Sequence, residues 1–283
     1  MPQSYVDQNT LIALGVRARK PDFRKKLDDA LASGVLSVVV STWHLIESAN
    51  TKNLAAAIEL AEFVDSLKPA WLLERRDAQR LEVEEDFCAF LKLECQQKPR
   101  VTTRSAALAA LNGEKDAQKF DIPSPVFVKQ WIEHPDQLKV LEETYKKGVD
   151  TLIRLRELAK EGKLTEELRR RVDELLVMAS LPKTTPAGLD VGRELKIGYV
   201  QQVKIATLPT LAIETAISEH EWVSQGGADR NTLIDKFHLI SALPYVDEIV
   251  SDDKFFHEIY PWAQKTGHVK AKLVGNEELL KRF

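Results

Sequence analysis

Apolar and polar residues in the first third of the chain alternate between a helical period and short β-branched runs. A helical pattern begins at Pro21 and stops before Gly34, and a buried-strand pattern follows over residues 35–41. The next helix is expected to begin at Ser41 or Thr42 as its N-cap. This alternation predicts an α/β fold with a parallel sheet flanked by helices.

The same alternation continues in two other parts of the chain. Residues 54–67 form a helical pattern that Lys68 and Pro69 end, and Asp77 is expected to cap a helix that runs through Leu93. The last third is expected to contain a helix over 211–222, a turn at 226–227, a helix from 231 or 232 to Pro244, a strand in 247–253, and a final strand and helix in 269–283.

The alternation stops between residues 99 and 208. Residues 100–127 show no regular period and are expected to be irregular. Helical patterns over 138–158 and 164–178, separated by Gly162, are typical of an α-hairpin, and residues 181–189 are expected to form a loop. We therefore predict a discontinuous domain of residues 1–98 and 209–283, and a large, mostly helical insertion over residues 99–208.

Composition places the chain among proteins with an ordinary buried core. The 283 residues are 44% hydrophobic and 29% charged. No apolar run approaches the ~20 residues of a membrane span, and the first residues lack the pattern of a signal peptide. Cys88 and Cys95 are expected to be buried or half-buried thiols, because a zinc site would require more nearby ligands. These features favour a cytoplasmic protein without a membrane partner.

Charge is distributed unevenly, although the net charge is only −3. One basic run could follow the phosphates of a nucleic acid, and it could equally be a solvated helix face; it consists of Arg17, Arg19, Lys20, Arg24, Lys25 and Lys26. A second basic group, at residues 169–171, is expected to pair with Glu166, Glu167 and Glu174.

Four separated acidic residues carry the candidate chemistry: Asp7, Glu47, Asp235 and Asp253. Asp7 and Asp253 follow strand patterns, whereas Glu47 and Asp235 lie on helices beside strands. In open parallel sheets the functional cleft lies outside the carboxyl ends of the strands. Carboxylates gathered there suit hard cations such as Mg²⁺ or Mn²⁺. Singly, each could be a turn, capping or surface residue, and Asp252 is the alternative to its neighbour.

Three segments resemble the PIN-domain family of metal-dependent nucleases. The first is an apolar strand that ends in Asp-x-Asn at Asp7 and Asn9. The second is a strand, a Ser/Thr turn at residues 41–42 and the helical Glu47. The third is the block DKFHLISALPYVDEIVSDDKFF, which ends in a Thr-x-Asp-x-x-Phe-like turn with Ser251 in place of threonine. The resemblance covers roughly the first and last thirds of the chain.

The resemblance implies a metal-dependent endoribonuclease that binds Mg²⁺ or Mn²⁺ through the four acidic residues. Supporting roles around the metal are expected for Asn9, Ser41, Thr42 and Ser251. It also implies RNA as substrate, an antitoxin-like protein partner and a homodimer, although the length of the chain argues against a simple toxin. A catalytically idle PIN-like module that binds RNA or protein, and a DNA-directed nuclease of the flap-endonuclease type, remain as alternatives.

Three other side chains near this pattern have ordinary explanations. His238 lies three residues after Asp235 and is expected to be a packed or hydrogen-bonded helix residue. Trp43 could stack a base but is expected to be part of the core. Asp247 is expected to be a turn residue before a strand.

Overall fold

The fold is built on a six-stranded sheet with the order β4-β3-β2-β1-β5-β6. The computed structural model describes residues 2–50, 53–114, 116–182, 191–223 and 230–283. Adjacent strands pair in parallel except β3 and β4, so the sheet is mixed at one edge rather than wholly parallel as predicted. The strands are β1 (Gln3–Val6), β2 (Ser37–Ser41), β3 (Ala70–Leu72), β4 (Val101–Thr102), β5 (Glu248–Val250) and β6 (Lys272–Val274).

β1 lies at the centre of the sheet, where Tyr5 pairs with Val39 on one side and Ile249 on the other. All three side chains are fully buried, as expected for a strand run with helices on both faces. The chain leaves β1 towards β2 and β3 and later returns to β5 on the opposite side. This reversal between β1 and β5 is the topological switch point at which α/β sheets commonly place their sites.

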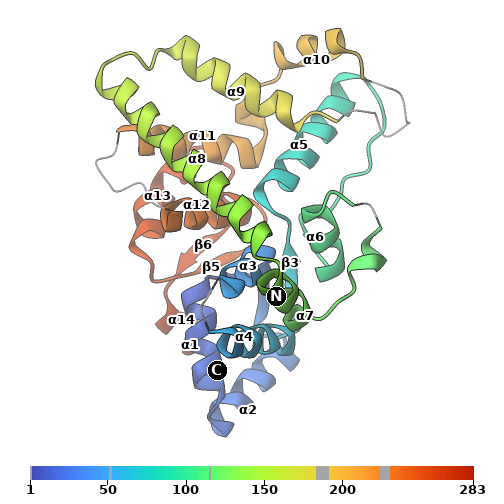
Figure 1. The fold of residues 1–283 in the computed structure, drawn as a ribbon, viewed down its shortest axis with the longest axis vertical. Coiled ribbons are helices and arrows are strands. Elements are labelled where there is room, and N and C mark those ends of the chain that lie inside the picture. Colours follow the sequence, from blue (N-terminus) through green and yellow to red (C-terminus); the bar gives the residue numbers. More distant parts are fainter. Residues whose placement is uncertain (1, 51–52, 115, 183–190, 224–229) are drawn as a thin grey trace.

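Helices cover both faces of the sheet and extend beyond it (Figure 1). They are α1 (Gln8–Ala18), α2 (Pro21–Ala32), α3 (Thr42–Ala49), α4 (Leu54–Ser66), α5 (Arg75–Phe90), α6 (Arg104–Leu111), α7 (Ser124–Glu133), α8 (Pro135–Lys160), α9 (Glu166–Ser180), α10 (Arg193–Val200), α11 (Pro209–Val223), α12 (Arg230–Ala242), α13 (Lys254–Gln264) and α14 (Asn276–Leu280), with short 3₁₀ turns at Ala117–Phe120 and Ile205–Thr207.

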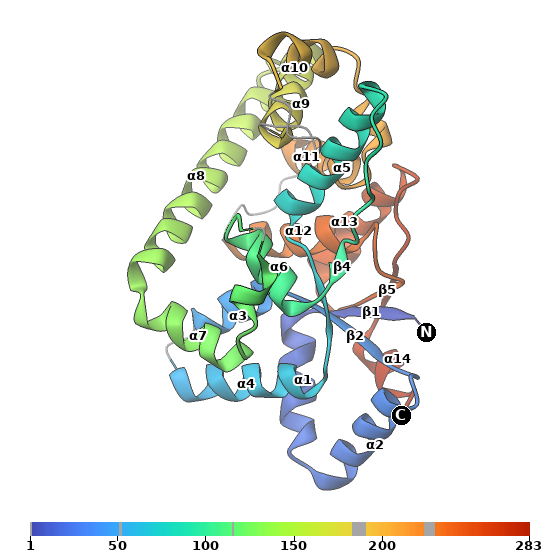
Figure 2. The same ribbon diagram turned by 90° about the vertical axis from the view of Figure 1, so that its right-hand side faces the viewer.

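Two hydrophobic cores lie on opposite sides of the sheet. One joins β1 and β2 to α1, α3, α4, α6 and α7, with Leu11 and Leu45 fully buried in it. The other joins the strands to α11, α12 and α13 through Ile213, Leu239 and Ile259. Figure 2 shows these two groups of helices on either side of the strands. Among the described residues, no helix is both long and apolar enough to cross a membrane.

The expectation of irregular structure over residues 100–127 is wrong. This segment contains β4, α6 and the start of α7, and Leu108 and Phe127 are buried in the first core. The Thr103 side chain caps α6 by accepting a hydrogen bond from the Ala106 amide. The alanine-rich run then favours a helix, which the flanking Gly113 and prolines concealed in the sequence. The domain limits at 99 and 208 stay a prediction, although α6 and α7 pack as part of the sheet core.

The two long helices α8 and α9 confirm the helical patterns around Gly162, which has a positive φ of 66°. Figure 1 shows them joined at this turn and running apart rather than packing side by side. α8 contacts α11 and α12, whereas α9 contacts α5 and α10. Glu74, not Asp77, is the N-cap residue of α5. The turn expected at 226–227 and most of the loop expected at 181–189 lie outside the described residues.

Candidate carboxylate site

Asp7 lies where β1 ends and α1 begins, with only 8% of its surface exposed. Its Oδ1 accepts a hydrogen bond of 2.7 Å from the Thr10 amide and so caps α1. Its Oδ2 accepts a short hydrogen bond from the Ser251 hydroxyl, and the Ser251 oxygen accepts one of 3.0 Å from the Asp253 amide. Ser251 therefore fixes the ends of β1 and β5 against each other.

A hollow of about 460 Å³ opens beside these two strand ends. Its lining residues include four from the predicted set: Asp7, Asn9, Asp252 and Asp253. Asp253 caps α13 by accepting from the Phe255 amide at 2.7 Å, and Asp252 accepts from the Asn276 amide at 3.0 Å where α14 begins. Both neighbouring aspartates thus face helix amides, and hydrogen bonding does not single out one of them as a ligand.

Glu47 approaches the same edge of the sheet from the second turn of α3. Its Oε2 accepts a 3.1 Å hydrogen bond from His238 Nε2, and the other ring nitrogen of His238 bonds to the Tyr5 hydroxyl. Burial lowers the pKa of His238, but the Glu47 hydrogen bond and nearby negative charges raise it more, so the pKa is raised overall. His238 therefore links Glu47 to Tyr5 through its two ring nitrogens, a role that its single position on a helix did not reveal.

Asp235 lies one turn before His238 on α12 and is half-buried. Its pKa is raised to about 7. Burial is the largest cause; the His238 charge opposes it, and the charges of Asp253, Glu47 and Asp7 reinforce it. Asp235 is thus within electrostatic range of the other three predicted carboxylates, although they come from four separate segments of the chain.

A layer of buried polar residues supports this edge from beneath. His44 Nδ1 accepts from the Ser41 amide at 2.9 Å, and its Nε2 donates to the Val6 carbonyl at 2.9 Å. Burial and the charge of His238 lower the pKa of His44 to about 3, so the ring is neutral and can make both bonds. Ser41 thereby supports the end of β1 and does not bond to a predicted carboxylate.

Glu74 is a fifth carboxylate that the sequence analysis did not select. It follows β3, is 6% exposed and accepts a short hydrogen bond from the Thr42 hydroxyl. Burial raises its pKa to about 7. No metal motif includes this position, and its only sequence signal is an acidic residue directly after a buried strand.

The donor chemistry of the site suits a hard divalent cation, because all four predicted ligands are carboxylates. Among the described residues, however, no group of three or more His, Cys, Asp or Glu side chains is spaced to hold a metal ion. The charges of Asp7, Glu47 and Asp253 affect the pKa of Asp235, but the four side chains do not form a group of ligands around one point.

The basic run over residues 17–26 is divided in space: Arg17 lines a hollow with Asp252 and Arg19 lines one with Glu47, whereas Arg24, Lys25 and Lys26 lie on α2. Asp7 is at the start of α1, and the 11 residues of that helix carry the chain ~16 Å away before the run is complete. Two of its arginines make exposed ion pairs, Arg19 with Glu59 at 2.7 Å and Arg24 with Asp28 at 2.8 Å. These features are those of a solvated helix face.

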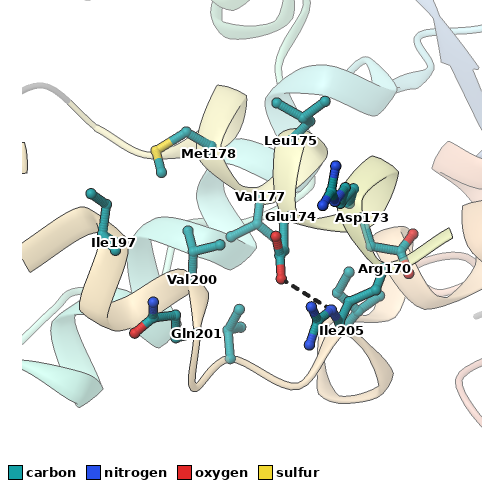
Figure 3. Close-up of a pocket in the computed structure, with 12 residues that line it drawn as sticks. Arg170, Asp173, Glu174, Leu175, Val177, Met178, Ile197, Val200, Gln201 and Ile205 are labelled. Atoms are coloured by element: carbon teal, nitrogen blue, oxygen red, sulfur yellow. Dashed lines mark ion pairs between the residues drawn. The ribbon is translucent and has the colours of Figure 1, made fainter. Parts of the chain in front are cut away.

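The arginines of α9 are also paired, as predicted. Arg170 lies 3.5 Å from Glu174, and Arg171 lies 2.7 Å from Glu167. Figure 3 shows Arg170 and Glu174 at a hollow of about 970 Å³ between α9 and α10, with Val177 and Val200 among its apolar lining. No residue of the predicted carboxylate set lines this hollow.

The two cysteines have the burial that was expected, Cys88 being buried and Cys95 partly so.

Compared with protein families, with curated proteins and with solved structures, the chain matches none of them. The resemblance to the PIN-domain family therefore rests on the motifs of the sequence.

Proposed function

We propose that this protein is a metal-dependent endoribonuclease with a PIN-like fold, in which Asp7, Glu47, Asp235 and Asp253 bind Mg²⁺ or Mn²⁺. The observation that supports this most strongly is that Asp7 and Asp253 line one hollow at the carboxyl ends of β1 and β5, while the charges of both, and of Glu47, act on Asp235. This hollow adjoins the crossover between β1 and β5, where open α/β sheets place their functional clefts.

Residues of this chain would orient the carboxylates of such a site and give it its negative charge. Ser251 aligns Asp7 with Asp253, and His238 holds the Glu47 carboxylate. Burial, and after it the charges of Asp253, Glu47 and Asp7, raise the pKa of Asp235, and a cation at this position would relieve both effects. A bound divalent ion would supply stabilisation of the charge that develops on the phosphate and activation of water. Asn9, in the same hollow, is placed to contact substrate or solvent.

A cleavage assay with the Asp7→Asn variant tests this proposal. Asparagine caps helices as well as aspartate does, so α1 should keep its N-cap while the site loses one charge. Single-stranded RNA should be cleaved by the wild-type protein with Mn²⁺ and not with EDTA, and the variant should lose at least ~100-fold in rate. The matched control is Asp28→Asn, which alters an exposed aspartate paired with Arg24 and should leave the rate unchanged.

Undiminished cleavage by the Asp7→Asn variant, or no metal-dependent cleavage by the wild-type protein, would contradict the proposal. Running single-stranded and flap DNA beside the RNA separates the DNA-directed alternative.

A catalytically idle RNA-binding module is the second candidate. It is favoured by the absence, among the described residues, of a closed group of metal ligands. This candidate predicts RNA binding without cleavage and no heat of Mn²⁺ binding in calorimetry. The antitoxin-like partner and the homodimer stay predictions of the family resemblance.

A further inference from the structure

A second cavity, of about 690 Å³, lies beside the carboxylate site and beneath α8. The elements that line it also build the carboxylate site: α3 carries Trp43 and Glu47, and α12 carries Phe237 and Asp235. α8 closes the cavity from outside, and it approaches α12 so closely that a Cβ added at Gly148 would lie 3.1 Å from the Leu233 side chain. The two sites are therefore neighbours on shared elements.

One wall of this cavity is aromatic. The rings of Trp43 and Phe237 lie with their centroids 6.0 Å apart and their planes inclined by 37°. The guanidinium of Arg75 lies over the Phe237 ring at 4.3 Å, and an ion pair with Glu214 fixes it there. Aromatic rings and arginine planes of this kind are the surfaces on which unstacked nucleobases pack.

A buried acceptor lies at the same cavity. Glu74 lines it and is 6% exposed. Its Oε1 accepts from Thr42, whereas its Oε2 is buried with no hydrogen-bond partner among the described residues. A buried carboxylate oxygen without a donor is costly, so a ligand that brings an N–H group to it would be selected.

The charges around the cavity favour an anionic ligand over a cationic one. Two basic side chains of its lining are already paired, Arg75 with Glu214 and Lys236 with Glu221, and two others form no ion pair among the described residues: Arg76 and Lys147. Arg76 and Lys147 are exposed and can meet phosphates. A polyamine would satisfy Glu74 but would be repelled by Arg76 and Lys147, whereas a nucleotide can satisfy Glu74 with its base and these two cations with its phosphates.

We propose that the cavity beneath α8 binds a nucleobase with an exocyclic amino group, which donates to Glu74 Oε2 while the ring packs on Trp43 and Phe237. This inference rests on the proposed nuclease function: a base bound in this cavity would place its phosphodiester beside the carboxylates. It names adenine, cytosine or guanine as the preferred base and disfavours uracil, which has no amino group.

Binding without catalysis tests this inference separately from the nuclease proposal. In EDTA, calorimetry with oligoadenylate, oligocytidylate and oligouridylate tetramers should show tighter binding of the first two by the wild-type protein. Glu74→Gln should reduce that preference about tenfold, because an amide replaces part of the acceptor with a donor. Phe237→Leu keeps an apolar side chain but removes the ring, and it should weaken all tetramers about tenfold.

A cavity-blocking pair of variants supplies the matched control. Thr151 lines the cavity from α8, so Thr151→Trp should abolish binding. Ile153 lies on another face of the same helix and is 42% exposed, so Ile153→Trp should leave binding intact. Circular dichroism confirms that each variant is folded.

Wild-type protein that binds no tetramer, or variants that all bind as the wild type does, would overturn the inference. Amino-base binding without any metal-dependent cleavage would instead refute only the nuclease function. If the protein cleaves RNA but Thr151→Trp and Phe237→Leu have no effect, the nuclease proposal stands and the base site is refuted.

Discussion

Replacing Glu74 with glutamine should stabilise the protein, and the gain should grow with pH. The side chain is buried at the carboxyl end of β3, and burial is the main cause that raises its pKa to about 7. The His238 charge opposes this effect and the Asp77 charge adds to it. Glutamine keeps an oxygen that can accept from Thr42, but it cannot ionise.

The sign follows from the proton balance between the two states. The unfolded chain loses the Glu74 proton near the ordinary value of 4.5, whereas the folded protein keeps it until about 7. Stability therefore falls as pH rises between these values and stays low above them. The gap corresponds to roughly 3 kcal/mol above about pH 8, of which roughly 1 kcal/mol is already lost near pH 5.

Urea unfolding of the wild type and of Glu74→Gln, near pH 5 and near pH 8.5, measures this difference. The advantage of the variant should increase by about 2 kcal/mol between the two conditions. Glu59→Gln is the matched control: that side chain is 55% exposed and paired with Arg19, so its effect should stay below ~1 kcal/mol at both. An advantage that does not change with pH would refute the reasoning, because a constant offset reports packing rather than ionisation.

Three further outcomes are expected. Leu108→Ala should lower the free energy of unfolding by about 2–5 kcal/mol in urea, because the side chain is fully buried in the sheet core. Ser251→Ala should weaken Mn²⁺ binding in calorimetry by about 10-fold or more, because Asp7 loses the hydroxyl that orients it. Reversing Lys25 and Lys26 to glutamate should leave RNA affinity nearly unchanged in a filter-binding assay, because α2 lies beyond the far end of α1 from the carboxylates.

Local sequence signals determined most of the elements that build the site. Pro21 and Gly34 bound α2, and Ser41 precedes α3 so that Glu47 falls in its second turn. Asp7 and Asp253 follow β-branched strands and cap the helices after them. These features depend on residues a few positions apart, which is why composition and period reveal them.

The tertiary structure alone decided how these elements meet. The bond between Glu47 and His238 joins residues 191 positions apart, and no local pattern encodes it. α6 and α7 belong to the sheet core because Leu108 and Phe127 find apolar partners on distant strands and helices. Lys25 and Lys26 are close to Asp7 in sequence, yet the length of α1 separates them from it in space.

Tertiary packing also raised the pKa of Glu74, because it buries the side chain. Its neighbours in sequence are unremarkable, and the α8 segment that covers its cavity begins about sixty positions later. The sequence therefore determined which carboxylates stand at strand ends. Packing between distant segments determined which carboxylates interact electrostatically and which one faces a cavity. Desolvation depends on burial by other segments, and Coulomb energy depends on distance in space rather than along the chain.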